Sequence, residues 1–125
     1  MSQLRFDPNR RLQSQIQDIL EAINATESFV QGLDFNQFSE DQKTIYAIER
    51  SLGIVGTTAK RLPWELINNY SEINWREIMG LGEKLTFGLF EVDIADLWRL
   101  IQEDLPKLKQ LMQEIQAEMT DQAQA

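Results

Sequence analysis

The apolar residues between Ile45 and Leu62 recur every three or four positions, and this rhythm limits what the chain can fold into. The residues are Ile45, Ile48, Leu52, Val55, Ala59 and Leu62. Side chains at this spacing share one face of an α-helix, whereas a strand would alternate at every second residue. Ser39 is predicted as the N-cap of this helix, with Gln42 completing a capping box. We therefore expect a long amphipathic helix over residues 40–62, packed against partner helices.

Two glycines, Gly53 and Gly56, lie inside this predicted helix. Glycine weakens a helix, so a pair of them needs a compensating advantage. We interpret the pair as a sign that another backbone packs closely against this part of the helix.

Similar helical periodicity is present at both ends of the chain. Asp7 and Pro8 are a typical N-cap and first-turn pair, which predicts a first helix over residues 8–31. A last helix is predicted over residues 93–119, and Pro106 must kink or split it. The polar residues 120–125 are expected to fray.

No segment shows sustained alternation with a period of two, so the predicted fold class is all-α. The expected architecture is an antiparallel helical bundle of about four to five helices. A short helix is expected from Trp64 to about Tyr70, followed by a turn and by a glycine-containing helical stretch from Trp75. The length indicates one domain over residues 1–125.

The composition excludes several kinds of site. The sequence has no cysteine and no histidine. Their absence argues against zinc, copper and haem sites, so we predict no metal and no cofactor. A chain without cysteine suits a reducing cytosol, and the N-terminus resembles no secretory signal, so a cytoplasmic location is expected. No apolar run has the length of a membrane span.

The net charge of −8 disfavours general binding to nucleic acids, because most of the surface repels phosphate. A local basic groove is still compatible with the sequence. Basic residues cluster at Arg5, Arg10 and Arg11, and again at Lys60 and Arg61.

Three sets of residues invite a functional interpretation, and each also has a simpler one. Glu83, Lys84 and Thr86 could act as a weak acid–base set, but a solvated helix face explains them more simply. The carboxylates are Glu91, Asp93 and Asp96. They could bind a hard cation, although Asp93 as N-cap and Asp96 in the first turn explain most of this set. Trp64, Trp75 and Trp98 could stack on bases, but core or interface anchors are the favoured interpretation.

Four short segments together resemble the HepT-like branch of the HEPN helical proteins. They are Gly56 to Leu62, Trp75 to Ile78, Val92-Asp93 and Asp104 to Pro106. The resemblance extends from the first helix to about Ile115. It implies a small helical bundle that forms a homodimer. Many such proteins are ribonuclease toxins, encoded beside a minimal nucleotidyltransferase that acts as the antitoxin.

The resemblance also implies a catalytic motif. In the family an Arg, four residues, a His, one residue and a Tyr follow one another on a helix near the dimer cleft. Cleavage is taken to be metal-independent, with the RNA 2′-hydroxyl as nucleophile, and the partner can attach AMP to the Tyr.

This chain departs from the motif at every position. Gly82 stands at the Arg position, Phe87 at the His position and Leu89 at the Tyr position, while Thr57 replaces the usual acidic residue after Gly56. None of the motif replacements can bind a phosphate, exchange a proton or accept AMP. We therefore predict no catalytic residue. The tyrosines of the chain, Tyr46 and Tyr70, lack the spacing of the motif.

The predicted function is that of a non-catalytic, dimeric interaction module that binds a minimal nucleotidyltransferase in a toxin–antitoxin type pair. Phe87, Leu89, Phe90 and Trp75 are the interface candidates, because they provide apolar surface where relatives keep a polar cleft. The alternative is a metal-independent ribonuclease toxin with an atypical or deliberately inactivated site.

Overall fold

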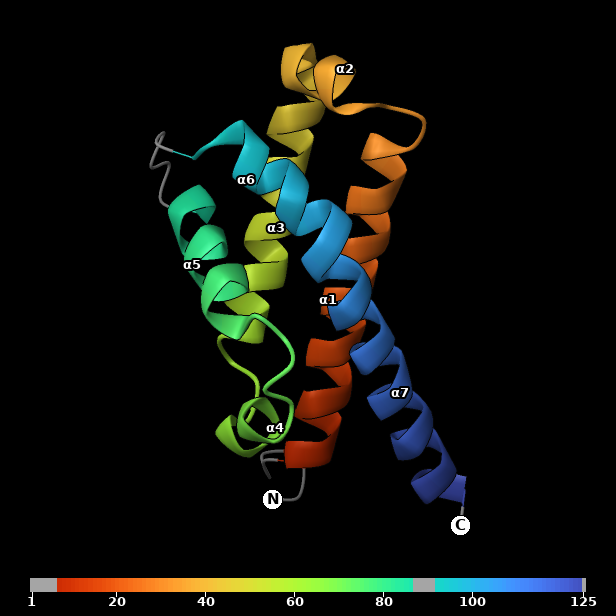
Figure 1. The fold of residues 1–125 in the computed structure, drawn as a ribbon. Coiled ribbons are helices and arrows are strands. Elements are labelled where there is room, and N and C mark those ends of the chain that lie inside the picture. The colour runs from red at the N-terminus through yellow and green to blue at the C-terminus, as the bar shows by residue number, and fades with distance from the viewer. Residues whose placement is uncertain (1–6, 87–91, 125) are drawn as a thin grey trace.

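The computed structural model describes residues 7–86 and 92–124, and within these ranges the chain is helical and contains no strand. In chain order the elements are α1 (Pro8–Val30), α2 (Phe35–Glu40), α3 (Gln42–Ala59), α4 (Trp64–Asn69), α5 (Trp75–Thr86), α6 (Ile94–Arg99), the π-helical segment η2 (Leu100–Asp104) and α7 (Leu105–Gln124). Helix α3 lies between α1 and α5, and the continuous rod of α6, η2 and α7 crosses in front of them (Figure 1). The prediction of an all-α antiparallel bundle is confirmed.

Helix α1 begins and ends as its sequence predicts. The carboxylate of Asp7 accepts hydrogen bonds from the backbone N–H groups of Asn9 and Arg10, at 3.1 and 3.3 Å. Pro8 occupies the first helical position, where its missing N–H has no intrahelical partner to lose. Beyond the C-terminal end, Gly32 has a φ of 80°, which only glycine adopts without strain.

The start of α3 differs from the prediction. Its N-cap is Asp41, whose carboxylate accepts from the backbone N–H of Thr44 at 3.1 Å and from the Thr44 hydroxyl at 2.7 Å. These hydrogen bonds, that of the hydroxyl first, lower the pKa of Asp41. Ser39, the predicted cap, lies inside α2 and donates to the carbonyl of Asn36. A charged carboxylate two residues later provides the stronger cap, so the shorter helix prevails.

Large aliphatic side chains from α1, α3 and the α6–α7 rod fill the core. The completely buried side chains include Ile16, Ile19, Ile23, Ile48, Leu97, Leu100, Leu105, Leu108 and Met112. One polar pair lies among them: the hydroxyls of Thr26 and Ser51 are 2.6 Å apart, and each also lies within hydrogen-bond distance of a carbonyl oxygen of its own helix. Within the described residues, no buried side-chain polar atom lacks a partner.

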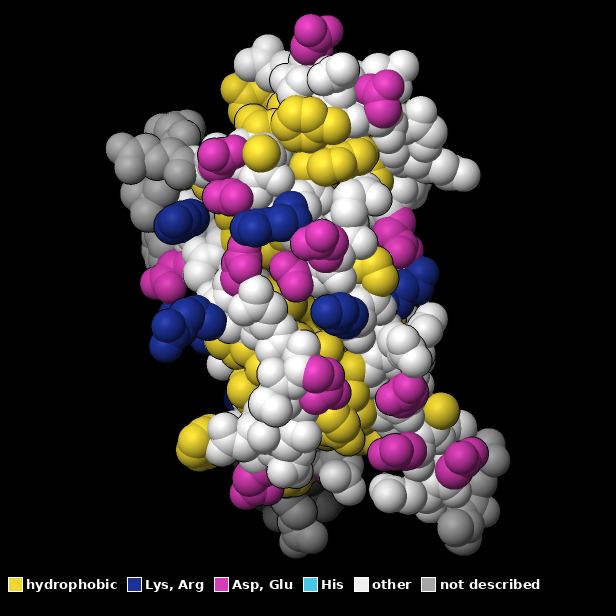
Figure 2. All heavy atoms as spheres, in the orientation of Figure 1, with side chains coloured by type: hydrophobic (Ala, Val, Ile, Leu, Met, Phe, Trp, Pro, Cys, Tyr) yellow, Lys and Arg dark blue, Asp and Glu magenta, His cyan; other side chains and the backbone are white. Residues whose placement is uncertain are grey.

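Aromatic residues close one end of the bundle. Phe38 of α2 is completely buried and packs on the indole of Trp98 from α6, with ring centroids 4.9 Å apart. Phe35 meets the same indole edge-on. The hydrophobic surface that gathers beside α2 and α6 in Figure 2 covers this region. The sequence favours a loop over residues 32–38 whose apolar side chains lie under the bundle, but the short helix α2 begins within this segment.

The last predicted helix is split at the place that Pro106 indicates. Proline has no N–H, and its ring crowds the preceding turn. The chain widens into the π-helical segment η2 just before this residue, and the N–H of Leu105 donates to the carbonyl of Leu100, five residues earlier. Helix α7 then continues to Gln124, farther than predicted, and the Thr120 hydroxyl donates to the carbonyl of Gln116.

None of the helices within the described ranges is both long enough and apolar enough to pass through a bilayer.

Candidate functional site

Helix α5, in which the sequence predicts the first position of a degenerate motif, is fixed against the bundle by its N-terminal residues. The indole N–H of Trp75 donates to the carbonyl of Tyr70 at 2.9 Å, and the Trp75 side chain is only 8% exposed. Ile78, one turn later, is also buried. The side of α5 that continues from these residues therefore faces α3, and Gly82 lies on it.

Gly82 and Gly56 bring the backbones of α5 and α3 into direct contact. A Cβ atom added at Gly82 would lie 2.5 Å from the Cα of Gly56. A Cβ added at Gly56 would lie 2.7 Å from the carbonyl oxygen of Ile78. Real Cβ atoms do not approach backbone atoms so closely. The expectation that the glycines of α3 mark the close approach of another backbone is confirmed at Gly56.

Threonines continue the same contact beyond the glycine pair. A Cβ added at Gly53 would lie 3.3 Å from the hydroxyl of Thr86, which itself donates to the carbonyl of Gly82 at 2.8 Å. Thr57, at the position of the usual acidic residue, donates to the carbonyl of Gly53 at 2.8 Å. Both hydroxyls are therefore bonded to their own helices, and neither forms part of an acid–base pair.

The other charged residues of α5 lie on its solvent side. Glu83 forms an exposed ion pair with Lys60 at 3.4 Å, and Lys84 is exposed. Such pairs contribute little to stability because water screens them. Glu83, Lys84 and Thr86 share no mutual hydrogen bond or ion pair. Phe87, Leu89, Phe90 and Glu91 lie outside the described residues.

Asp93 and Asp96 act as helix-terminal acids. Asp93 is the N-cap of α6 and accepts from the N–H of Ala95 at 2.8 Å. Both aspartates line a shallow pocket together with Arg76 and Lys84, whose charges disfavour a cation there. Among the described residues, no group of His, Cys, Asp and Glu has an arrangement suited to a metal ion.

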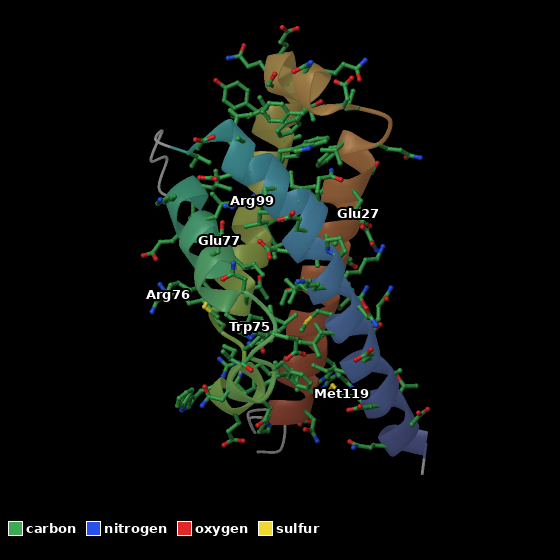
Figure 3. All side chains as sticks on the ribbon, in the orientation of Figure 1. Glu27, Trp75, Arg76, Glu77, Arg99 and Met119 are labelled. Carbon is green, nitrogen blue, oxygen red and sulfur yellow. The ribbon has the colours of Figure 1, made fainter. Side chains whose placement is uncertain are left out.

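A charged network joins α5 to the α6–η2 segment. The guanidinium of Arg99 lies 3.2 Å from a carboxylate oxygen of Glu77 and 3.2 Å from one of Asp96 (Figure 3). Asp104 lies near the same group, and its pKa is raised, first by burial and then by the negative charge of Glu77. This network ties helices together on an exposed face, where Figure 2 shows acidic and basic side chains interleaved.

The tryptophans have separate roles. Trp75 is a core residue of the single chain, so its predicted place at an interface stays a prediction. Trp98 packs on Phe35 and Phe38. Trp64 is 67% exposed, so the interpretation of this residue as a core anchor is wrong. Its position at the start of a six-residue helix with no buried residue explains the exposure.

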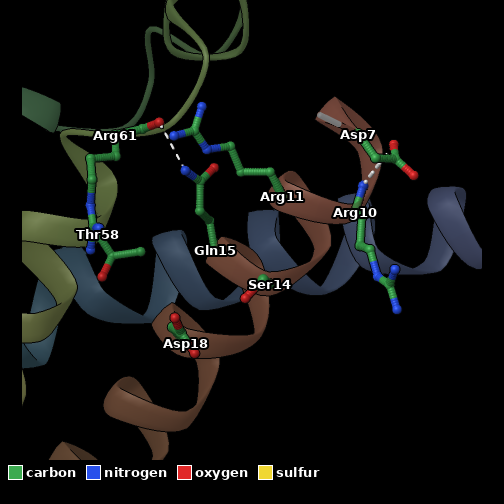
Figure 4. A pocket seen from close by; sticks show the side chains of 8 residues that line it. All are labelled: Asp7, Arg10, Arg11, Ser14, Gln15, Asp18, Thr58 and Arg61. Atoms are coloured by element: carbon green, nitrogen blue, oxygen red, sulfur yellow. Dashed lines mark hydrogen bonds between the residues drawn. The ribbon is translucent and has the colours of Figure 1, made fainter. Parts of the chain in front are cut away.

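The structure brings together two of the basic clusters that are far apart in the sequence. Arg10 and Arg11 of α1 and Arg61, just after α3, line one pocket (Figure 4). The amide of Gln15 donates to the carbonyl of Arg61 at 3.1 Å and holds the two helices in this register. Periodicity alone could not pair these clusters, because their meeting depends on the antiparallel packing of α1 and α3.

Comparison with known proteins gives one family. The model of the "Ribonuclease HepT-like" family matches residues 19–115. The "Probable ribonuclease HepT" of Thermococcus cleftensis is 38% identical over 94 residues, which cover 75% of this chain and 86% of that protein. A "Putative RNase" of Methanocaldococcus jannaschii is 30% identical over 100 residues, covering 80% of this chain and 92% of the relative.

A "Putative RNase" of Caldanaerobacter subterraneus is 35% identical over 86 residues, covering 69% of this chain and 77% of the relative. No solved structure gives a significant match. The family match spans the α3–α5 contact and the α6–α7 rod, so it rests on the segments that build the fold. The chain belongs to the HepT-like ribonuclease family.

Proposed function

We propose that this chain is a non-catalytic member of its family, which acts as a dimeric interaction module for a minimal nucleotidyltransferase. The observation that carries the proposal is the contact of Gly82 with Gly56. Position 82 is where the family's arginine would bind a phosphate. Here a Cβ would already meet the Cα of Gly56 at 2.5 Å, so the position serves helix packing.

The absence of histidine supports the same proposal. A metal-independent nuclease needs groups that exchange protons with the 2′-hydroxyl and with the leaving oxygen. The sequence has no histidine to perform this role at neutral pH, and Glu83 and Lys84 are exposed to solvent. A carboxylate or ammonium group surrounded by solvent and not aimed at a partner serves poorly as a general acid or base.

The dimer is supported by an apolar groove on the outer face of α1 and α3. Its lining includes Ala22, Ala25, Phe29, Ala47 and Ile54. The alanines allow a second pair of helices to approach closely, and 40% of Phe29 is exposed. Asp18 and Glu21 on α1 and Arg50 on α3 border the groove. The groove is thus bordered by charges of both signs, so a second copy of the same face can place basic groups against acidic ones.

Light scattering tests the dimer and this face together. The wild type is expected at twice the monomer mass at micromolar concentration. Ala25→Arg, which places a charge in the groove, is expected to shift the mass toward monomer. Ala95→Arg, a substitution of the exposed alanine on α6, is the matched control and should leave the dimer intact. A wild type that is monomeric throughout would remove the dimer from the proposal.

A second candidate function is a metal-independent ribonuclease with an atypical or deliberately inactivated site. The names of the relatives favour it, because each describes a ribonuclease. The residues that would carry it are Glu83 and Lys84, since these are the titratable groups next to position 82.

A cleavage assay decides between the two functions. Purified protein is expected to leave single-stranded RNA intact above a buffer blank, with and without divalent metal. Cleavage that grows with protein concentration, survives repurification and disappears in Glu83→Ala or Lys84→Ala would establish the second function instead.

Co-purification tests the partner. The chain is expected to bind a minimal nucleotidyltransferase whose gene lies beside its own, and both proteins are expected in the cytosol. The acidic surface of this chain should make the association sensitive to salt. Intact mass should show no added AMP, because Leu89 offers no hydroxyl. The failure of any complex to form at low salt would contradict the proposed partner. An AMP adduct on Tyr46, which is 61% exposed, would show that modification persists without the motif.

A further inference from the structure

We propose that the pocket between the start of α1 and the end of α3 is a binding site for phosphate groups. It is lined by Asp7, Arg10, Arg11, Ser14, Gln15, Asp18, Thr58 and Arg61. Nothing in this site depends on residues 82–89, so the proposal stands whether or not the chain cleaves RNA.

The arginines reach the pocket from separate helices. Arg10 and Arg11 lie in the first turn of α1, and Arg61 follows the C-terminal end of α3. In Figure 4 the side chain of Arg11 extends across Gln15 toward the backbone of Arg61, while the guanidinium of Arg10 lies at the rim. The hydrogen bond from Gln15 to the Arg61 carbonyl fixes the separation of the two helices. Gln15 is itself buried, so this support is part of the packed structure.

Helix stability does not explain the basic residues on α1. The N-terminal end of a helix carries a partial positive charge, which favours acidic side chains and disfavours arginine. Helix α1 nevertheless has no acidic residue in its first turn, and two successive arginines lie there. Three of the seven arginines of the chain thus meet in one pocket of a protein with a net charge of −8. A bound anion would offset this local concentration of positive charge.

The donors that line the pocket are better suited to bind a phosphate group than a carboxylate ligand. Two guanidinium groups can each donate paired hydrogen bonds to the oxygens of one tetrahedral anion. The hydroxyl of Ser14 adds a donor at the same face. The nearby carboxylate of Asp7 is occupied by the N–H groups of the helix start, whereas Asp18 lies one turn of α1 beyond Ser14 and lines the same pocket (Figure 4). The remaining Asp18 charge limits the site to weak, salt-sensitive binding.

Phosphate of this kind can belong to a free mononucleotide or to the backbone of an RNA strand. Titration with inorganic phosphate, AMP and a short single-stranded RNA, each at low ionic strength and followed by amide chemical shifts, separates these sources. We expect shifts at Arg11, Ser14 and Arg61 with each probe. A tighter affinity for RNA, falling with salt at a slope of about −0.7 for each phosphate bound, identifies the strand backbone as the ligand. Equal affinity for AMP identifies a single phosphate.

Charge reversal provides the decisive comparison. Arg11→Glu with Arg61→Glu is expected to weaken binding of every probe at least tenfold. Lys43→Glu with Arg76→Glu changes two exposed basic residues outside the pocket by the same total charge, and should change affinity less than threefold. The helical circular dichroism of both double variants should match the wild type, and Arg11→Lys with Arg61→Lys should retain part of the binding.

Two outcomes overturn the proposal. One is the absence of any shift in the pocket with all three probes at low salt. The other is an equal loss of affinity in both charge-reversed pairs, because it would assign the binding to long-range attraction and not to this pocket.

Discussion

Helix α3 packs against its two long neighbours in different ways. Toward α1 it presents large aliphatic side chains, such as Ile48 and Leu52, which belong to the same buried core as Ile19 and Ile23. Toward α5 it presents glycine, and the two backbones touch. The first interface is stabilised by the burial of large side chains. The second depends on glycines, which have no side chain and so allow the two backbones to touch.

This difference determines what each interface can accept. Removing atoms from the α1 side leaves a cavity, whereas adding atoms to the α5 side forces the helices apart. Position 82 belongs to the second interface. If this position corresponds to the family's arginine, as we propose, the loss of the motif is a change in helix packing as well as a loss of chemistry.

The largest effect is expected from Gly82→Arg. The new side chain must separate α3 from α5, and this disrupts the contacts of both helices with the rest of the core. We expect a loss of about 5 kcal/mol or more in the free energy of unfolding, comparable with the total stability of a small domain. Urea denaturation monitored by circular dichroism measures it. A variant as stable as the wild type would mean that position 82 has room for the family's residue.

On the α1 side, Ile48→Ala is expected to destabilise the fold by about 2–5 kcal/mol, because the side chain is completely buried. Ile48→Val, which removes a single methylene, should reduce the free energy of unfolding by only about 0.5–1.5 kcal/mol. The same denaturation experiment measures both. If Ala and Val gave equal losses, cavity formation would not be the source of the effect.

A smaller and pH-dependent change in the free energy of unfolding is expected when Asp104 is substituted. Burial and the charge of Glu77 raise its pKa in the folded state, so the ionised carboxylate opposes folding. At neutral pH the Asp104→Asn variant should therefore be somewhat more stable than the wild type. This difference should shrink as the pH falls through the raised pKa, and should vanish below about pH 3.9, where the unfolded carboxyl is protonated as well.

Thermal unfolding of the wild type and of Asp104→Asn, each at several pH values, measures this difference in stability. Glu103→Gln, a neighbouring substitution of the same kind on an exposed residue, is the control and should show a weaker dependence. A wild type that gains stability over Asp104→Asn with rising pH would have the opposite sign to the one that burial predicts.

The sequence predicted those parts of the fold that depend on local pattern. The spacing from Ile45 to Leu62 predicted α3, Pro106 predicted the break before α7, and Gly53 with Gly56 predicted a close backbone contact. The partner in that contact, Gly82, was not predicted, because its identification requires the register of α5 against α3. The same limitation applies to the pocket of Arg11 and Arg61.

The sequence pattern also could not decide which of two neighbouring residues caps the N-terminus of α3. Ser39 with Gln42 and Asp41 with Thr44 are both plausible starts for α3, and their relative strength depends on where α2 ends. The core alternative for Trp64 is wrong for a related reason: its aliphatic neighbours Leu66 and Ile67 are only half-buried, because α4 is too short to form a buried face of its own. Its role as an interface anchor stays a prediction.

The most direct test compares two glycines of the same helix. Gly80 and Gly82 both lie inside α5, but a Cβ added at Gly80 has no atom within 4 Å, whereas one at Gly82 would lie 2.5 Å from Gly56. Urea unfolding of Gly80→Ala should show a gain of about 0.5–1 kcal/mol, because alanine favours the helix. Gly82→Ala should show a loss of about 1–3 kcal/mol from overpacking. Equal gains in the two variants would contradict the claim that position 82 is closed by contact with α3.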